Sequence, residues 1–376
     1  MVSHRTGTKK VLIIGGGIAG IALANFLQDS DWDITITERA SGWRTIGFGV
    51  GIWINGLKIL QKLNLGESFW SKTTLIAGGA VVDISGRMIF EIPASKLGVS
   101  EMARTVERDV LHKALTRRFS DKVTIRFNTD FADIKQLSDK VEVTFKDGSA
   151  EQFDVVVGAD GIRSEVRQKI FGDHMKSYGW TAHVYWAEKT VGLYDDYYIA
   201  TDHRKIFLNM PSGDRCVIGF GYINGEHRNP IEKEPEQLLE EFSALSPQMK
   251  EVVESIDHSK GMFQDRLDYV SLKRWHKGNI VLIGDAKHGL SPVSGFGTSL
   301  ALEDGYALSE ALKENLPIQH ALKKFAKTRN RDLRNIGLFA RIMEAGLLAK
   351  SRLPGVCMRV FPTSFVISLL KKALAV

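Results

Sequence analysis

The chain has only two cysteines among its 376 residues, Cys216 and Cys357. They lie far apart in the sequence, so neither a disulfide framework nor a cysteine-based metal cluster is supported. We therefore expect no metal site and a protein of the reducing cytoplasm.

Long apolar runs are also missing. The segment after Lys9 and Lys10 resembles a signal peptide, but four positions between 11 and 27 are glycines, which favours a strand followed by a helix. Near the end, Arg359 and Pro362 interrupt the apolar residues, so we expect no transmembrane segment. The apolar residues there recur at helical spacing beside Lys371 and Lys372, and they are Phe361, Phe365, Val366, Leu369 and Leu370. This amphipathic helix either packs against the protein itself, which we favour, or contacts a membrane or partner.

No stretch concentrates charge of one sign. The 50 Lys and Arg residues interleave with 44 Asp and Glu residues to give a net charge of +6. This pattern indicates a solvated surface rather than a nucleic-acid-binding one. The hydrophobic content of 44% and charged content of 25% are typical of a soluble globular protein. The length suggests about two domains.

Glycine, by contrast, is grouped. Residues 15–20 read Gly-Gly-Gly-Ile-Ala-Gly, between an apolar run at 11–14 and a helical stretch at 18–27. Gly15 allows a tight turn, Gly17 lets the main chain approach a pyrophosphate, and Gly20 lets the helix pack closely on the strand. The helix start at Ile18 and Ala19 offers free amides to phosphates. This arrangement predicts a dinucleotide-binding turn.

An acid follows the next strand. Glu38 comes after an apolar strand at residues 34–37, about 20 residues beyond the glycines, where a carboxylate accepts hydrogen bonds from a ribose. Because that carboxylate would repel a 2′-phosphate, the site suits FAD or NAD rather than NADP.

Two further glycine-rich motifs occur, Gly158-Ala159-Asp160-Gly161 and Gly284-Asp285-Ala286. Asp285 ends an apolar strand at 280–283, so its carboxylate can accept from sugar hydroxyls, although helix capping would also explain it. Gly295 and Gly297 precede a helix that begins near Thr298, where backbone amides could approach a flavin carbonyl. Together these motifs predict an FAD site.

The pattern of expected elements is α/β with an interruption. Helices are expected at 54–63, 108–119, 298–312 and 318–349, and strands at 77–83 and 88–92. A hairpin is expected from 141–145 and 153–157 around Asp147-Gly148. Short aromatic-rich strands run from 175 to about 270, with one helix near 236–242. We predict a Rossmann-like, parallel-sheet FAD-binding domain (1–70, 101–173 and 275–340), an inserted and mostly antiparallel substrate domain (71–100 and 174–274), and a C-terminal helical segment (341–376).

In these motifs the chain resembles the class A flavoprotein monooxygenases, the single-component aromatic hydroxylases of the para-hydroxybenzoate hydroxylase type. That family includes urate hydroxylases and tetracycline-inactivating enzymes, and its FAD-binding domain is of the GR2 type. The resemblance implies that Asp160 and Gly161 lie near the flavin and the nicotinamide, that Asp285 contacts the ribityl chain, and that Arg108 contacts the flavin. We expect the cofactor site also to include Arg39, Gly51, Pro292, Gly295, Phe296, Gly297, Thr298 and Ser299.

The resemblance also implies a reaction. There is no second strand-GxGxxG-helix unit, so NADH or NADPH would bind transiently, reduce FAD and leave. Oxygen would then form a C4a-hydroperoxyflavin that hydroxylates an aromatic or polycyclic small molecule. Two alternatives stay open: an FAD-dependent reductase or dehydrogenase such as a prenyl-chain reductase, and a flavin-binding protein without turnover. We expect a monomer or weak dimer.

For several residues the sequence does not assign a single role. Arg44 is either a flavin or nicotinamide contact or a solvated loop residue. Tyr185, Arg204 and Lys205 are the substrate-pocket candidates from the inserted strands, although each alone is more typical of a structural residue. His288 is not assigned as a base. Lys287 and Phe296 depart from the family pattern, which commonly has alanine and glutamine at these positions; the cation would change the flavin potential or meet the substrate, and Phe296 would remove a polar group near the ring.

Overall fold

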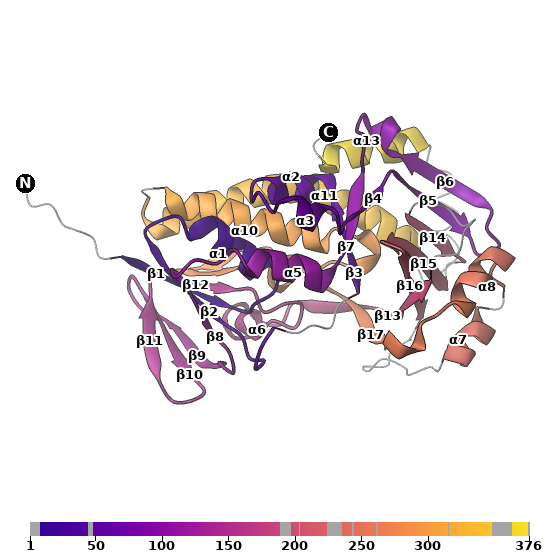
Figure 1. Cartoon of the computed structure of the whole chain (residues 1–376). Helices are drawn as coiled ribbons and strands as arrows, with labels where there is room; N and C mark the ends of the chain where they lie inside the picture. Colours follow the sequence, from indigo (N-terminus) through magenta and orange to yellow (C-terminus); the bar gives the residue numbers. More distant parts are fainter. Residues whose placement is uncertain are drawn as a thin grey trace, which may run out of the picture.

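Two large sheets of different kinds make up the protein. The computed structural model describes residues 8–43, 48–188, 197–202, 204–223, 235–242, 244–260, 262–314, 316–347 and 363–374. In Figure 1 the sheet that contains β1 and β2 lies at the left, and the sheet that contains β13 to β17 lies at the right. The predicted α/β architecture, with a parallel nucleotide sheet and a mostly antiparallel second sheet, is confirmed.

The nucleotide sheet has six strands in the order β18-β19-β12-β1-β2-β8, all parallel except the β18–β19 pair. Its strands are β1 (Lys9–Ile14), β2 (Trp32–Thr37), β8 (Val123–Arg126), β12 (Val155–Gly158), β18 (His276–Lys277) and β19 (Ile280–Leu282). β1, β12 and β19 are almost entirely apolar and buried, as expected for strands covered on both faces.

Helices cover one face of this sheet. Apolar side chains of β1 and β2 pack there with α1 (Ile18–Leu27), α5 (Arg108–Thr116) and α10 (Gly297–Lys313), and α10 in turn contacts α2 (Ile54–Gln61) and α11 (Ile318–Leu347). The opposite face is covered by a small antiparallel sheet and a helix: β9 (Phe131–Gln136), β10 (Val141–Phe145), β11 (Ala150–Phe153) and α6 (Glu165–Phe171).

The predicted hairpin around Asp147-Gly148 needs a correction. β10 does pair with β11, with Val141 opposite Phe153. The residues after Phe153 leave the hairpin, however, and form β12 beside β1, with Val157 opposite Ile13. The single strand predicted at 153–157 is therefore wrong, because Phe153 ends β11 in one sheet and residues 155–157 belong to β12 in another.

The second sheet has seven strands in the order β17-β13-β16-β15-β14-β5-β6, and only the β14–β5 pair is parallel. Its strands are β5 (Gly78–Asp83), β6 (Met88–Pro93), β13 (Met175–Glu188), β14 (Tyr197–Thr201), β15 (Lys205–Ser212), β16 (Arg215–Ile223) and β17 (Phe263–Val270). One face packs against α7 (Pro235–Glu241) and α8 (Pro247–Glu254), the second of which was not predicted.

Small elements join the two sheets. A three-stranded sheet, β3-β7-β4, consists of β3 (Gly49–Trp53), β4 (Thr74–Ile76) and β7 (Ala103–Glu107). The remaining elements are α3 (Glu67–Trp70), α4 (Ala94–Leu97), α9 (Asp285–His288), α13 (Thr363–Leu374) and the 3-10 turns η1 (His258–Lys260) and η2 (Pro292–Ser294). The predicted domain boundaries stay a prediction.

The last helix packs against the protein, as favoured from the sequence. Val366, Leu369 and Leu370 of α13 are buried in a cluster with α11, whereas Phe365 is exposed. Phe361, Arg359 and Pro362 lie outside the described residues. Among the described helices, none combines the length and apolar character needed to span a bilayer.

Candidate active site

The first glycine turn lies between β1 and α1, as the motif predicts. Gly15 has a φ of +108°, and a Cβ there would lie 2.5 Å from the Ala159 carbonyl oxygen, so only glycine fits. A Cβ at Gly20 would lie 2.5 Å from the Gly15 carbonyl, whereas a Cβ at Gly17 would meet nothing closer than 3.8 Å. The turn is therefore tight on its protein side and open at Gly17, where the amides at the start of α1 could receive a phosphate.

Glu38 stands directly after β2, next to this turn. Its Oε2 accepts from the Gly16 amide at 3.1 Å and its Oε1 accepts from the Ala40 amide at 3.0 Å. Two aromatic side chains close the same turn: the Trp43 ring lies against Gly16, and His112 Nε2 donates to the Gly16 carbonyl at 3.0 Å. Burial lowers the pKa of His112. The acid thus lies against the glycine turn at the end of β2, and its contact with an adenosine ribose stays a prediction.

Asp160 follows β12, so the second motif lies beside the first. Its Oδ2 accepts from the Val166 amide at 3.1 Å, while its Oδ1 is buried without a hydrogen-bond partner. Burial raises the pKa of this carboxyl group. A buried acceptor without a donor is costly, so this oxygen fits a ligand that donates a hydrogen bond.

Asp285 is the first residue of α9, which follows β19 and Gly284. Its side chain is exposed to solvent. Protein nevertheless surrounds it closely enough that burial, the largest influence, raises its pKa, while His288 and Arg108 pull the pKa down. Gly297 is exposed as well, and a Cβ there would lie 3.9 Å from Asp285 Oδ1. These two residues therefore border one solvent-accessible space between the starts of α9 and α10, which we call the recess.

Arg167 links the second and third motifs. It is completely buried, and its guanidinium donates to the Ala286 carbonyl at 3.0 Å and to the Ile162 carbonyl at 2.7 Å. Carbonyls of two turns that are more than 100 residues apart are therefore held by one rigid side chain.

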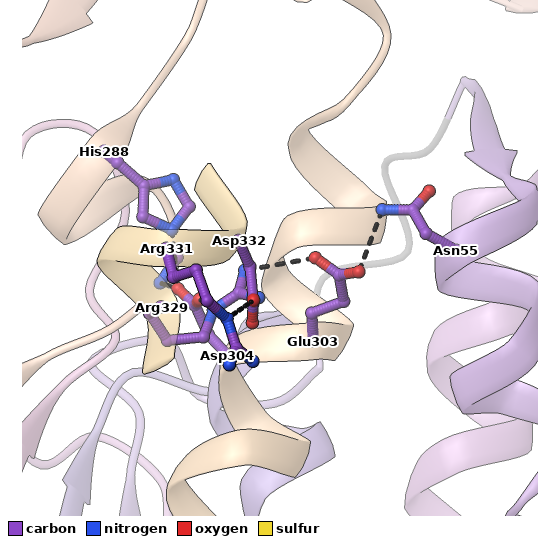
Figure 2. Close-up of polar contacts among 8 residues, drawn as sticks. Asn55, His288, Glu303, Asp304, Arg329, Arg331 and Asp332 are labelled. Carbon is purple, nitrogen blue, oxygen red and sulfur yellow. Dashed lines mark hydrogen bonds and ion pairs between the residues drawn. The ribbon is translucent and has the colours of Figure 1, made fainter. Parts of the chain in front are cut away.

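Behind the third motif lies a buried polar group that we call the Asp304 cluster, shown in Figure 2. Asp304 of α10 accepts from the Gly284 amide, from His288 Nε2 and from Arg329 Nε at 2.8, 2.6 and 2.7 Å. Arg329 also donates to Glu303, which accepts from Asn55 on α2. The third motif is thereby tied to α10, α11 and α2.

The two departures from the family pattern are both buried. Lys287 Nζ donates to the Leu272 carbonyl at 2.8 Å and lies 4.4 Å from the Trp275 ring centroid. Phe296 is fully buried and stacks on Trp53 with centroids 4.8 Å apart. The expected effects of these two residues on the flavin or substrate stay predictions.

The other predicted cofactor residues differ in how far they are exposed, and their contacts with the cofactor stay a prediction. Pro292 and Gly297 are exposed, and Gly51, Gly295, Thr298, Gly161 and Arg108 are partly exposed. Ser299 is different, because its hydroxyl is buried and accepts from the Trp53 amide at 2.9 Å. Arg39 lies at the surface and pairs with Glu165 at 3.7 Å. Arg44 lies outside the described residues.

The three pocket candidates are not brought together with the recess. Tyr185 is buried on the face of the seven-stranded sheet that α7 and α8 cover, and its hydroxyl contacts Met262. Lys205 Nζ donates to the Glu241 carbonyl on the same side, and Arg204 is exposed in the β14–β15 turn.

Tyr197 and Asp304 were not among the residues singled out from the sequence. Tyr197 is the first residue of β14, packs against three apolar clusters and donates to the Val293 carbonyl at 3.4 Å, beside η2. Burial raises the pKa of its hydroxyl group. The sequence pattern could have indicated Asp304 and Arg329, because each is a charged residue within the apolar stripe of a predicted helix.

Sequence comparison places the chain among flavoproteins. The model of the FAD binding domain family matches residues 8–330. The FAD-dependent monooxygenase asL4 of Sarocladium schorii is 26% identical over 80% of this chain and 74% of its own length. The 2-heptyl-3-hydroxy-4(1H)-quinolone synthase of Pseudomonas aeruginosa is 29% identical over 80% of this chain and 79% of its own length.

Solved structures share this fold. The crystal structure of Klebsiella pneumoniae HpxO complexed with FAD and uric acid superposes with a TM-score of 0.85 at 20% identity, covering 98% of this chain and 97% of that one. The resemblance drawn from the glycine motifs is confirmed by the family match, which spans all three of them. The chain therefore belongs to the FAD binding domain family, as a flavoprotein of the class A monooxygenase type.

Proposed function

We propose that this protein is a monooxygenase that binds FAD, consumes NADH or NADPH together with O2, and hydroxylates an aromatic or polycyclic small molecule. The observation that supports the proposal is the convergence of the three motifs at the ends of the neighbouring strands β1, β12 and β19, where Gly15 packs against Ala159 and Gly284 packs against Ala19. The balanced reaction converts substrate–H, O2, NAD(P)H and a proton into substrate–OH, NAD(P)⁺ and water.

Different residues would hold the successive parts of FAD. The amides of Ile18 and Ala19 would receive the pyrophosphate, Glu38 the adenosine ribose, and Asp285 the ribityl hydroxyls, while the unpaired Asp160 Oδ1 would accept one further hydrogen bond. Bound FAD would supply the electron-transfer and oxygen chemistry. The protein's share is to bind, orient and exclude water.

The substrate side is bounded by the inner face of the seven-stranded sheet. Trp186, Met210 and Val217 form an apolar cluster there, against which Phe48 and Tyr197 pack. A surface of this kind suits a flat, largely uncharged ring system, and Tyr197 offers a hydroxyl that can donate or accept. The Pseudomonas relative, named for a quinolone product, is consistent with such a substrate class.

The test is coupled turnover. The purified protein should bind FAD and oxidise NADH or NADPH faster when phenols, quinolones, purines or polyketides such as tetracycline are added, with matching O2 uptake and a hydroxylated product. NAD(P)H oxidation without O2 uptake would instead indicate a reductase. Protein that binds no FAD would remove the proposal's basis.

A variant sharpens this test. Asp285→Asn should weaken FAD binding about 10–100-fold, because hydrogen bonds to a charged acceptor contribute about 1.5–3 kcal/mol. The matched control is Asp31→Asn, which changes an exposed acid before β2 and should leave the FAD dissociation constant unchanged. Equal affinity of both variants would contradict the role of Asp285.

A further inference from the structure

The turn at Gly284 to His288 presents different groups to its two sides. Asp285 faces the recess, whereas the Gly284 amide and His288 Nε2 both donate to Asp304 Oδ2, at 2.8 and 2.6 Å, on the opposite side. A carboxylate oxygen only accepts, so His288 carries a hydrogen on Nε2. One oxygen of Asp304 thus holds both ends of the short helix α9.

Asp304 is not itself a ligand-binding group. Its side chain is completely buried, and its other oxygen accepts from Arg329 Nε at 2.7 Å. Arg329 is fixed in turn by Glu303 at 3.1 Å and Asp332 at 3.5 Å. Any influence of Asp304 on the recess must therefore pass through the turn.

The turn has little freedom to shift on its own. Gly284 has a φ of +60°, and a Cβ there would lie 2.8 Å from the Ala19 Cβ at the start of α1. On the other side, Arg167 holds the Ala286 carbonyl. Losing the Asp304 contacts would release the turn at Gly284 and His288 while Arg167 still held its middle.

We propose that Asp304 is a positioning residue: by accepting from Gly284 and His288 it fixes the turn so that the Asp285 carboxylate faces the recess, and Arg329 keeps Asp304 in place. The effect on FAD rests on the proposed function, whereas the effect on the turn does not.

The experiment compares Asp304→Asn with Glu303→Gln. Both variants neutralise a neighbouring acid of α10 that contacts Arg329, but only Asp304 touches the turn. Hydrogen exchange measured by mass spectrometry on peptides that cover residues 283–289 should speed up at least about tenfold in Asp304→Asn and not in Glu303→Gln. The FAD dissociation constant should rise about 10–100-fold in the first variant, as is typical when a group behind a ligand-binding residue is lost.

A second variant separates positioning from general stability. The double variant Asp304→Ala with Arg329→Met removes the acceptor together with the buried cation that would otherwise be uncompensated, so its melting temperature should largely recover relative to Asp304→Ala alone. The faster exchange at 283–289 and the weaker FAD binding should persist, because alanine at position 304 offers Gly284 and His288 no acceptor. Recovery of FAD affinity together with the melting temperature would overturn the proposal, and so would unchanged exchange in Asp304→Asn. If the wild-type protein bound no FAD, the proposed function would fail, but the exchange comparison would still decide whether Asp304 holds the turn.

Discussion

Arg329 Nε and Asp304 Oδ1 lie 2.7 Å apart, and their side chains are only 2% and 0% exposed. They come from two helices, α11 and α10, and the acid also holds the Gly284 amide behind the candidate FAD site. A buried ion pair of this kind adds little net stability, because both charges lose their hydration, but removing one partner leaves the other charge uncompensated.

Replacing Arg329 alone should therefore be severe. We expect Arg329→Met to lower the free energy of unfolding by about 3–5 kcal/mol, because Asp304 would remain buried without its cation. Urea unfolding followed by circular dichroism measures this. The control is Arg331→Met, which removes an exposed cation whose only described acid partner is Asp332 at 3.3 Å, and it should change stability by less than about 0.5 kcal/mol. Similar losses for both variants would contradict the interpretation.

The same pair predicts acid sensitivity. Burial alone would raise the pKa of Asp304, but His288, Arg329 and the hydrogen bonds lower it to about 2, from an ordinary value of 3.8. Because the folded-state pKa is depressed, the stabilisation is complete above pH 3.8 and is lost as the pH falls through about 2. Its size is on the order of 2 kcal/mol. Asp304→Asn should show a flatter loss of stability between pH 4 and 2, and equal slopes would argue against the depressed pKa.

Lys287 gives a pH dependence of the same sign at alkaline pH, but here it is the charged form that destabilises the fold. Burial lowers its pKa to about 8, from 10.5, although Asp304 partly opposes this. Between these values the unfolded chain binds more protons than the folded one, so the contribution of this group to stability rises as the pH rises from 8 to 10.5. Below pH 8 the buried cation costs up to about 3 kcal/mol.

Lys287→Met should therefore stabilise the protein at pH 7 by about 1–2 kcal/mol, after the lost hydrogen bond to Leu272 is counted. The advantage should disappear as the pH rises above about 10.5, where the wild-type lysine becomes neutral in both states. Thermal unfolding at pH 7 and above pH 10 measures the difference. A variant less stable than the wild type at pH 7 would show that the contact with Trp275 outweighs the desolvation cost.

Close approach of two helices should make Gly305 irreplaceable. A Cβ on Gly305 of α10 would lie 2.6 Å from the Leu23 amide nitrogen and 3.0 Å from the Ala19 carbonyl of α1, and backbone atoms cannot move aside cheaply. We expect Gly305→Ala to cost about 1–3 kcal/mol or more and to weaken FAD binding, because α1 carries the glycine turn.

The matched control for this change is Gly337→Ala in α11. A Cβ at Gly337 would meet nothing within 4 Å, so the substitution should stabilise the helix by up to about 1 kcal/mol. Melting temperatures and FAD titrations of both variants test the contrast. A neutral Gly305→Ala variant would show that α1 and α10 separate without cost.

Local patterns were sufficient for the nucleotide half of the molecule. Gly15, Gly20 and Glu38 lie where the spacing predicted, because a strand-turn-helix unit is specified by contacts among residues close in sequence. The fold class followed for the same reason, since strands such as β1 and β12 have apolar runs that only a doubly covered sheet requires.

What the sequence by itself determined about this protein is thus its class of fold and its cofactor motifs, whose signals are short and strictly spaced. Only the tertiary structure decided that α7 and α8 cover Tyr185 whereas Tyr197 lies on the opposite face of the sheet, beside Val293, since alternation along a strand separates two faces without saying what each one meets. It also decided that Asp304 meets Arg329, His288 and Gly284. Such pairings join residues from different elements, and their energies depend on burial that no local pattern contains.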